Sequence, residues 1–265
     1  MASSIDIAND EAPPVDATID YIPSHQLTPL SDPDSHIQGL IEGLESKDWI
    51  KLCESLNDTR RLALYHSTLL IPFIEPVMVV MVKAIKNPRS ALCKTSIMTA
   101  ADIFTVYRDK LLEPTISAAF DNLLLQLLLK SSQDKRFVCE EADKTLNSMV
   151  QSITPLPLLQ KLQIYASHNN PKVRAKAAIY LSNSVSRMNL EELQEFGLVS
   201  LVQAAAKLLN DRLPEAREAA RSTIMSVYKL YPEDEDQKQE SWQNFCESNL
   251  PALHGQSIIK ITTSH

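Results

Sequence analysis

Residues 170–181 read NPKVRAKAAIYL, and this stretch decides the fold. Pro171 follows a polar turn, at the first position of an expected helix, where the missing N–H of proline costs nothing. Val173, Ala177 and Leu181 then recur at a spacing of four residues, which places them on one face of a helix. The stretch therefore predicts a polar turn followed by an amphipathic helix.

The same pattern recurs along the chain. A basic residue follows the first apolar position in the clearest copies, and this slot falls at positions 52, 94, 139, 174 and 217. The mean step of about 41 residues lies in the range of HEAT and armadillo repeats, which pair an A helix with a B helix. We therefore predict an all-α fold, an α-solenoid of five to six HEAT/armadillo-like helix pairs. The expected A helices lie near 36–45, 73–86, 114–131, 155–168 and 191–210, the B helices near 49–67, 89–107, 135–151, 171–187 and 214–230, and a capping helix near 236–248.

The composition divides the chain into three parts. Residues 1–34 are rich in proline, aspartate and serine and show no stable period, so they cannot bury enough apolar surface to offset the entropy of ordering. We expect a disordered acidic, Pro-rich arm there, a helical-repeat domain over 35–248, and a C-terminal tail over 249–265 without an assignment.

The chain has only four glycines, at positions 39, 43, 197 and 255. A dinucleotide-binding loop, a P-loop and a nucleophile elbow each need clustered glycines for tight turns and close backbone approach. None of these motifs can be written from this set. A helical solenoid fits the deficit, because it uses glycine mainly at helix ends.

Other enzyme signatures are also missing. The four cysteines contain no C-x-x-C pair, and the six histidines do not combine with each other or with cysteine at metal-ligand spacing. The acidic run of residues 233–236 lacks the alternation and the glycine of a Ca²⁺ loop. We therefore expect no enzymatic activity, no cofactor and no metal, and reduced cysteines buried in the helices of a cytosolic protein.

Charge and hydropathy narrow the partners. The net charge of −7 disfavours nonspecific nucleic-acid binding by the whole chain. The most apolar stretch, residues 71–85, contains two prolines, Glu75 and Lys83 and is short for a membrane span. We expect neither a nucleic acid nor a membrane as partner.

Positive charge gathers in the turns between the A and B helices. The five expected turns (47–51, 86–94, 130–136, 168–176 and 210–217) sum to +9, although the whole chain carries −7. All A–B turns of a solenoid lie on one edge. The sequence therefore predicts one basic edge, which suits an acidic, folded partner.

Four of these cations lie where the helix dipole disfavours positive charge. Arg89, Lys135, Arg136 and Lys172 lie at expected helix N-termini, where the helix dipole favours anions and a cation costs about 0.3–1 kcal/mol. They also precede the repeated slot and should point away from the turn. We interpret them as residues that contact a partner.

Two other arginines have a structural interpretation. Arg174 and Arg217 occupy the repeated slot, where arginine in HEAT repeats often pairs with an aspartate of a neighbouring repeat. Trp49 follows a helix break, and it is either a core residue or an exposed anchor of the kind found at interface hot spots.

From about residue 36 to 248 the chain resembles a TOG domain, most closely the CLASP N-terminal type. The resemblance rests on five features at repeat spacing, one in each turn: Asp48-Trp49, Arg89-Ser90, Lys135 with Arg136, Lys172 with Val173-Arg174, and Asp211 followed by Ala216-Arg217. TOG domains are six-HEAT-repeat paddles whose A–B turns bind αβ-tubulin.

The resemblance implies a TOG-like domain over 35–248 that binds αβ-tubulin or microtubules, in the cytoplasm and on the cytoskeleton, and regulates microtubule dynamics or organisation. It implies that the tubulin-binding residues are Trp49, Arg89, Ser90, Lys135, Arg136, Lys172 and Arg212. The alternative is a HEAT/armadillo scaffold that docks another protein without binding tubulin. A protein adaptor or an oligomer partner stays open as well.

Overall fold

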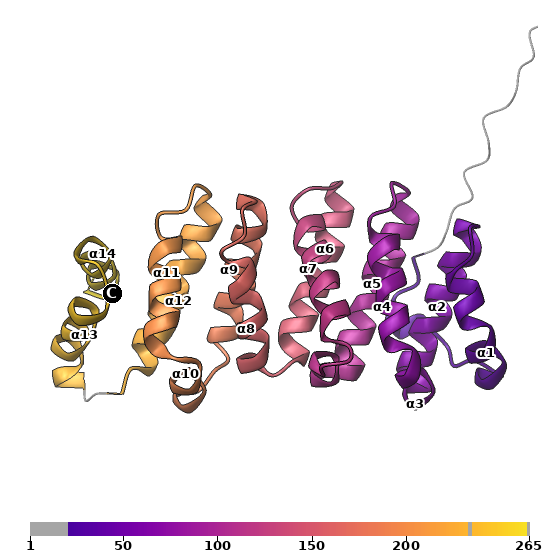
Figure 1. The fold of residues 1–265 in the computed structure, drawn as a ribbon, viewed down its shortest axis with the longest axis horizontal. Coiled ribbons are helices and arrows are strands. Elements are labelled where there is room, and N and C mark those ends of the chain that lie inside the picture. The colour runs from indigo at the N-terminus through magenta and orange to yellow at the C-terminus, as the bar shows by residue number, and fades with distance from the viewer. Residues whose placement is uncertain (1–20, 233–234, 264–265) are drawn as a thin grey trace, which may run out of the picture.

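A computed structural model describes residues 21–232 and 235–263. The described residues form six helix pairs in a row, without a strand, which confirms the predicted α-solenoid (Figure 1). The A helices are α1 (Pro33–Leu44), α4 (Ile74–Ile85), α6 (Ser117–Lys130), α8 (Pro155–Tyr165), α11 (Leu198–Leu208) and α13 (Glu235–Asn249). The B helices are α2 (Trp49–Tyr65), α5 (Ser90–Tyr107), α7 (Arg136–Ser152), α9 (Pro171–Val185), α12 (Pro214–Leu230) and α14 (Ala252–Thr263).

The B helices form one continuous layer. Helix α2 packs on α5, α5 on α7, α7 on α9, α9 on α12, and α12 on α14. Each B helix also packs on the A helix of its own repeat, and the core lies between the two layers. The core is mainly aliphatic, as the apolar face of each expected helix required, with Phe104 and Phe120 as an edge-to-face pair inside it.

Short elements connect one repeat to the next. They are α3 (Ser67–Leu70) with the 3₁₀ turn η2 (Ile71–Phe73), the 3₁₀ turn η3 (Arg108–Leu112), and α10 (Leu190–Phe196). The sequence predicted a single helix over 191–210, and this prediction is wrong because the chain forms two helices there, α10 and α11 (Leu198–Leu208). Gly197 has φ of 100°, a conformation that only glycine adopts readily, and it separates α10 from α11.

The expected arm of residues 1–34 also needs correction at its end. Residues 1–20 lie outside the described part of the chain. Residues 21–32 instead pack on the solenoid: they include the 3₁₀ turn η1 (Ser24–Gln26), and the side chain of Leu27 is only 2% exposed. Helix α1 begins at Pro33, capped by the carboxylate of Asp32, which accepts a hydrogen bond from the backbone N–H of Ser35. The polar, proline-rich composition of this segment predicted disorder, but the buried side chain of Leu27 attaches it to the solenoid.

The unassigned tail 249–265 contains helix α14. Gly255, Ile258 and Thr262 are buried and lie on one face of α14 at helical spacing, and Leu250, just before the helix, is buried as well. Gly255 lies against the backbone of Cys246 in α13, where a Cβ would be 3.4 Å from the carbonyl oxygen. The two helices of the sixth pair thus approach each other closely at Gly255.

By length and composition alone, residues 67–85 could cross a membrane. In the structure this stretch is split among α3, η2 and α4, and Ile74, Met78, Met81 and Ile85 are fully buried between helices. Packing in the solenoid core thus accounts for part of the high hydropathy, since 39% of this stretch is buried.

Three cysteines are buried as expected, and Cys139 is only half-buried. Burial raises the pKa of Cys53 and of Cys93 to about 11, and that of Cys246 to about 12. These three side chains act as small apolar residues of the core.

Candidate protein-binding edge

The turns between A and B helices lie along one edge of the solenoid. Figure 1 shows the α4–α5, α6–α7 and α11–α12 turns along its upper edge, with α3 and α10 along the lower one. We call the upper edge the turn edge; it comprises residues 45–49, 86–90, 131–136, 166–172 and 209–213. All seven sequence-predicted binding residues lie within it.

Contacts join the first three turns. The guanidinium of Arg89 lies 5.6 Å from the centroid of the Trp49 ring, a cation–π contact between the first and second turns. Lys135 Nζ donates a hydrogen bond of 3.0 Å to Ser90 Oγ, which joins the third turn to the second. Four of the predicted residues are thus brought together, although Trp49 and Lys135 lie about 86 positions apart in the sequence.

The chain of contacts continues to the fifth turn. Lys172 Nζ donates to the carbonyl oxygen of Ser132 over 3.5 Å, and Arg174 Nε donates to Asp211 Oδ2 over 2.7 Å. Arg217 donates to the carbonyl oxygen of Asp211 within its own turn. Both slot arginines therefore bind groups that hold the turns in place. Contacts therefore link the five turns in a row, the last of them made by Arg174, two residues beyond the fourth turn.

Some B helices have a side-chain cap at the N-terminus and others do not. Asp48 and Asn170 cap α2 and α9, because each side chain accepts a hydrogen bond from a backbone N–H in the first turn of its helix. Arg89 and Lys135 occupy the same cap position of α5 and α7 and make no side-chain cap hydrogen bond. Two adjacent helices thus begin with a cation where a capping residue would stabilise the fold.

The predicted residues differ in exposure. Arg89, Lys135, Arg136, Lys172 and Arg212 are exposed, and the side chain of Arg136 is 93% exposed even though it pairs with Glu140. Ser90 is half-buried. Trp49 is also half-buried and packs against the core, so it combines the two readings that the sequence left open.

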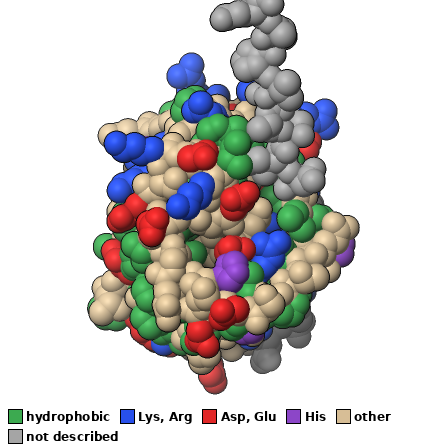
Figure 2. All heavy atoms as spheres, turned by 90° about the vertical axis from the view of Figure 1, so that its right-hand side faces the viewer, with side chains coloured by type: hydrophobic (Ala, Val, Ile, Leu, Met, Phe, Trp, Pro, Cys, Tyr) green, Lys and Arg blue, Asp and Glu red, His purple; other side chains and the backbone are tan. Residues whose placement is uncertain are grey.

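The formal charge of +9 counted over the five turns is larger than the charge of the cations that remain unpaired in the structure. Several counted cations form ion pairs, mostly with carboxylates outside the turns that the count did not include: Lys51 with Glu42, Lys94 with Glu141, Lys130 with Asp134, Arg136 with Glu140, Arg174 with Asp211, and Lys176 with Asp143. Lys47, Lys86, Arg89, Lys135, Lys172 and Arg212 make no salt bridge to any other described residue. Lys and Arg side chains gather toward the upper part of the end-on view, and Asp and Glu are more frequent below (Figure 2).

Two aspartates of the turn edge are held in their charged form. Burial by itself raises the pKa of Asp211, but hydrogen bonds from Arg174 and from the backbone N–H of Leu213 outweigh it and hold that pKa below its usual value. Asp134 follows the same pattern, with Lys130 and the backbone N–H of Lys135 as donors. Both carboxylates serve the geometry of the turns.

Sequence reasoning did not find the surroundings of Lys94. Its Nζ lies 4.5 Å from the ring centroid of Tyr21 and 5.8 Å from that of Phe137, and 3.4 Å from a carboxylate oxygen of Glu141. Tyr21 comes from the segment expected to be disordered. No local pattern connects it with a lysine more than 70 residues away.

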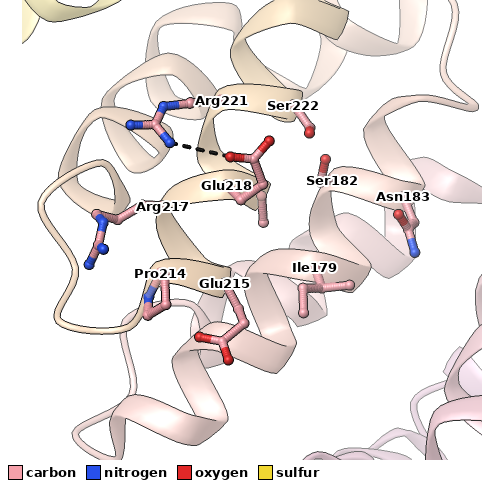
Figure 3. A pocket seen from close by; sticks show the side chains of 10 residues that line it. Ile179, Ser182, Asn183, Pro214, Glu215, Arg217, Glu218, Arg221 and Ser222 are labelled. Atoms are coloured by element: carbon pink, nitrogen blue, oxygen red, sulfur yellow. Dashed lines mark hydrogen bonds and ion pairs between the residues drawn. The ribbon is translucent and has the colours of Figure 1, made fainter.

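A groove of about 680 Å³ lies between α9 and α12. Figure 3 shows Glu218 and Arg221 paired beside it, with Ile179, Ser182 and Asn183 on the opposite wall. Arg217 is the one predicted site residue among those lining it. The groove therefore runs along the B-helix layer and is separate from the row of exposed cations.

The CLASP N-terminal family model matches residues 63–246. This chain belongs to the CLASP N-terminal family. The matched region begins inside α2 and ends inside α13, so family membership covers the second to fifth turns of the edge completely.

Two curated relatives are similar in sequence to this CLASP N-terminal chain. One is the mouse "TOG array regulator of axonemal microtubules protein 1", which is 30% identical over 206 residues, covering 76% of this chain and 11% of that protein. The human protein of the same name is 30% identical over 130 residues, covering 49% of this chain and 7% of that protein. The chain therefore spans a small fraction of the length of these relatives.

Solved structures share the fold of this CLASP N-terminal chain. A TOG domain of C. elegans Zyg9 has a TM-score of 0.63 at 15% identity, covering 92% of this chain and 91% of that one. The MAST/Orbit N-terminal domain has a TM-score of 0.58 at 15% identity, covering 85% and 96%. At these identities the likeness shows the fold alone, which is that of a TOG domain.

Proposed function

We propose that this chain is a non-enzymatic protein that binds αβ-tubulin or microtubules through its turn edge and so regulates microtubule dynamics or organisation. The names of its relatives and of its structural neighbours support the partner. They describe a regulator of axonemal microtubules, microtubule polymerases and "TOG-tubulin binding specificity". On this proposal the protein acts on the cytoskeleton.

The observation that carries the proposal is the row of exposed cations along one edge, with contacts between neighbouring turns. Arg89, Lys135 and Lys172 belong to three successive turns, and each touches the turn before it. Arg89 and Lys135 also occupy helix cap positions that an uncharged residue would fill more favourably. Side chains that cost local stability and are aligned on one edge are suited to an acidic, folded surface.

The mechanism that follows is electrostatic docking onto a preformed surface. Complementary charge raises the rate of association and makes binding sensitive to salt. Because contacts between turns already order the cations, little side-chain entropy is lost when the partner binds. Trp49, half-buried at the end of the row, supplies an apolar contact beside Arg89.

The test is size-exclusion chromatography or sedimentation with αβ-tubulin at low salt. Wild type is compared with Trp49→Ala and with the double variant Arg89→Ala/Lys172→Ala. The matched control is Lys144→Ala/Arg221→Ala, which removes two exposed charges from the middle of α7 and α12, away from the turn edge. We expect binding by wild type and by the control, and binding at least about tenfold weaker for the edge variants.

Two outcomes contradict parts of the proposal separately. If wild type does not bind tubulin at low salt, the tubulin function is wrong, and a scaffold that docks another protein becomes the better interpretation. If wild type binds and the edge variants bind as well as the Lys144→Ala/Arg221→Ala control, the function stands and the assignment to the turn edge is wrong.

A further inference from the structure

A strap of seven residues, 21–27, crosses the B-helix layer at the N-terminal end of the solenoid. The carbonyl oxygen of Ile22 accepts a hydrogen bond of 2.8 Å from Arg60 Nη1 of α2. That of Leu27 accepts one of 2.6 Å from the hydroxyl of Tyr65, five residues further along the same helix, at its C-terminus. The side chain of Leu27 is buried. The strap is thus fixed at both ends.

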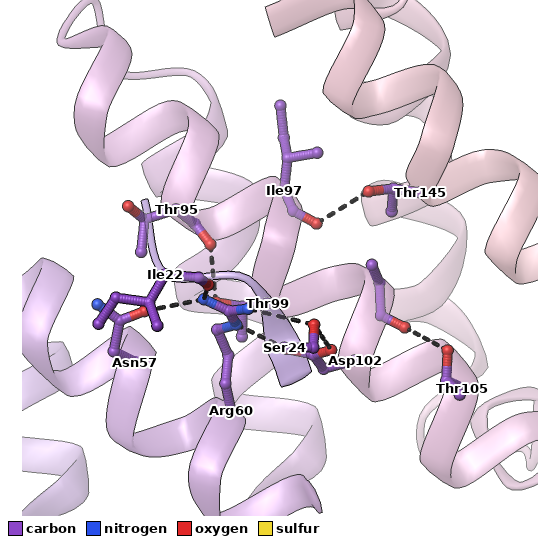
Figure 4. Close-up of polar contacts among 11 residues, drawn as sticks. Ile22, Ser24, Asn57, Arg60, Thr95, Ile97, Thr99, Asp102, Thr105 and Thr145 are labelled. Carbon is purple, nitrogen blue, oxygen red and sulfur yellow. Dashed lines mark hydrogen bonds and ion pairs between the residues drawn. The ribbon is translucent and has the colours of Figure 1, made fainter. Parts of the chain in front are cut away.

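A buried ion pair holds the middle of the strap. Arg60 Nε and Asp102 Oδ2 are 2.6 Å apart, with the two side chains 1% and 6% exposed. The hydroxyl of Ser24 donates to Asp102 Oδ1 over 2.6 Å, and Arg60 Nη2 donates to the Ser24 oxygen over 3.3 Å (Figure 4). A buried ion pair is favourable only when its remaining hydrogen-bonding groups are satisfied. Strap residues, together with Asn57 of α2, satisfy them here, so the strap belongs to the folded domain.

The strap carries an aromatic ring to the turn edge. Tyr21 is 37% exposed and its ring lies on Lys94, in the first turn of α5. Phe137, 38% exposed in the first turn of α7, lies on the same ammonium group. Glu141 pairs with Lys94, whose side chain is 18% exposed. The lysine therefore contacts two aromatic residues, each of which is more than a third exposed.

We propose that Tyr21 and Phe137 are additional partner-binding residues, which extend the turn edge onto the B-helix layer and contact the same αβ-tubulin surface. The inference rests on the proposed function. Phe137 directly follows Arg136 and Lys135, so an acidic surface docked on the cations lies next to both rings. Exposed aromatic side chains beside cations have the composition of interface hot spots. Lys94 is a positioning residue in this arrangement.

The test measures tubulin affinity for Tyr21→Ala and Phe137→Ala in the full chain. The matched control is Ile71→Ala, because Ile71 is also 37% exposed and lies in η2, toward the opposite edge. We expect binding about fivefold to tenfold weaker for each aromatic variant. The control should be unchanged, and Tyr21→Phe, which keeps the ring, should bind like wild type.

A second measurement separates ring contact from a general loss of folding. Leu27→Ala loosens the strap at its other end, so it should weaken binding, and adding Tyr21→Ala to it should weaken binding little further. Thermal unfolding of each variant shows whether the domain stays folded, and Ser24→Ala replaces Leu27→Ala if that variant unfolds. Additive effects of the two changes would show that Tyr21 acts without the strap and would overturn this part of the inference.

The inference and the proposed function fail in different ways. If wild type does not bind tubulin, the proposed function is wrong. If wild type binds and Arg89→Ala/Lys172→Ala weakens binding, but Tyr21→Ala and Phe137→Ala behave like Ile71→Ala, only the extension of the edge is wrong.

Discussion

Replacing Lys135 by asparagine tests whether this lysine lowers the stability of the folded domain while contributing to tubulin binding. Lys135 is the N-cap of α7, with extended backbone angles (φ −61°, ψ 145°) that suit a capping residue, yet its side chain caps nothing. The Nζ instead reaches Ser90 in the neighbouring turn. An asparagine side chain in this backbone conformation is expected to accept a hydrogen bond from an unpaired N–H in the first turn of α7.

The magnitude follows from three contributions. A new N-cap hydrogen bond stabilises a helix by about 1 kcal/mol. Removing a cation from a helix N-terminus contributes about 0.3–1 kcal/mol more. The lost contacts of Lys135 with Ser90 and with the Asp134 carboxylate are solvent-exposed and worth less than about 1 kcal/mol. The net expectation is a gain of about 1 kcal/mol in the free energy of unfolding, or about 2–4 °C in Tm for a domain of this size.

Urea and thermal unfolding followed by circular dichroism measure this change. Lys144→Asn is the matched control, because it makes the same substitution in the interior of the same helix, where asparagine costs about 0.5 kcal/mol. The two variants should therefore move in opposite directions. In the tubulin assay Lys135→Asn should bind about fivefold more weakly than wild type, and Lys144→Asn should not.

A loss of stability in Lys135→Asn would refute this reasoning. It would mean that the contact with Ser90 contributes more to the fold than a helix cap does, and that the cation is explained by structure alone. A gain of stability with unchanged tubulin binding would leave the cap argument intact and remove Lys135 from the binding edge.

Three further predictions concern the fold. Arg60→Leu leaves the buried carboxylate of Asp102 without its cation and should lower the free energy of unfolding by about 3–5 kcal/mol in urea; a loss under 1 kcal/mol would show that the pair is not essential. Asp211 has a lowered pKa, so its contribution is present above the unfolded pKa and is lost as pH falls through the folded value. Asp211→Asn should therefore destabilise the protein at pH 7, and its difference from wild type should shrink as the pH falls below about 4 and vanish only below the lowered folded pKa of Asp211; a difference that does not shrink at acid pH would contradict the role of its charge. Gly197→Ala should cost about 1–3 kcal/mol because alanine is strained at φ of 100°; thermal unfolding checks this, and an unchanged Tm would mean that the α10–α11 junction relaxes.

Local patterns in the sequence were enough to predict where the helix pairs lie. Apolar residues at helical spacing and polar turns with proline fix where a helix begins and which face it buries, and both are properties of neighbouring residues. The copy at Val173-Arg174 and its repetition therefore predicted the solenoid and most of its helices within a few residues. The predictions went wrong at Gly197 and at the strap, where one glycine or one buried leucine outweighs the average composition of its segment, and the stretch that forms α14 was left without an assignment.

The sequence by itself also placed the exposed cations on one edge, because A–B turns of a solenoid share an edge whatever their exact packing. Only the tertiary structure decided which charges remain unpaired, since Glu141 and Asp143 neutralise cations from an adjacent helix. It alone brought Tyr21 to Lys94 through a strap anchored on a buried ion pair. Ion pairs and ring contacts depend on distances between residues about 35 to 75 positions apart, and local periodicity carries no information about such distances.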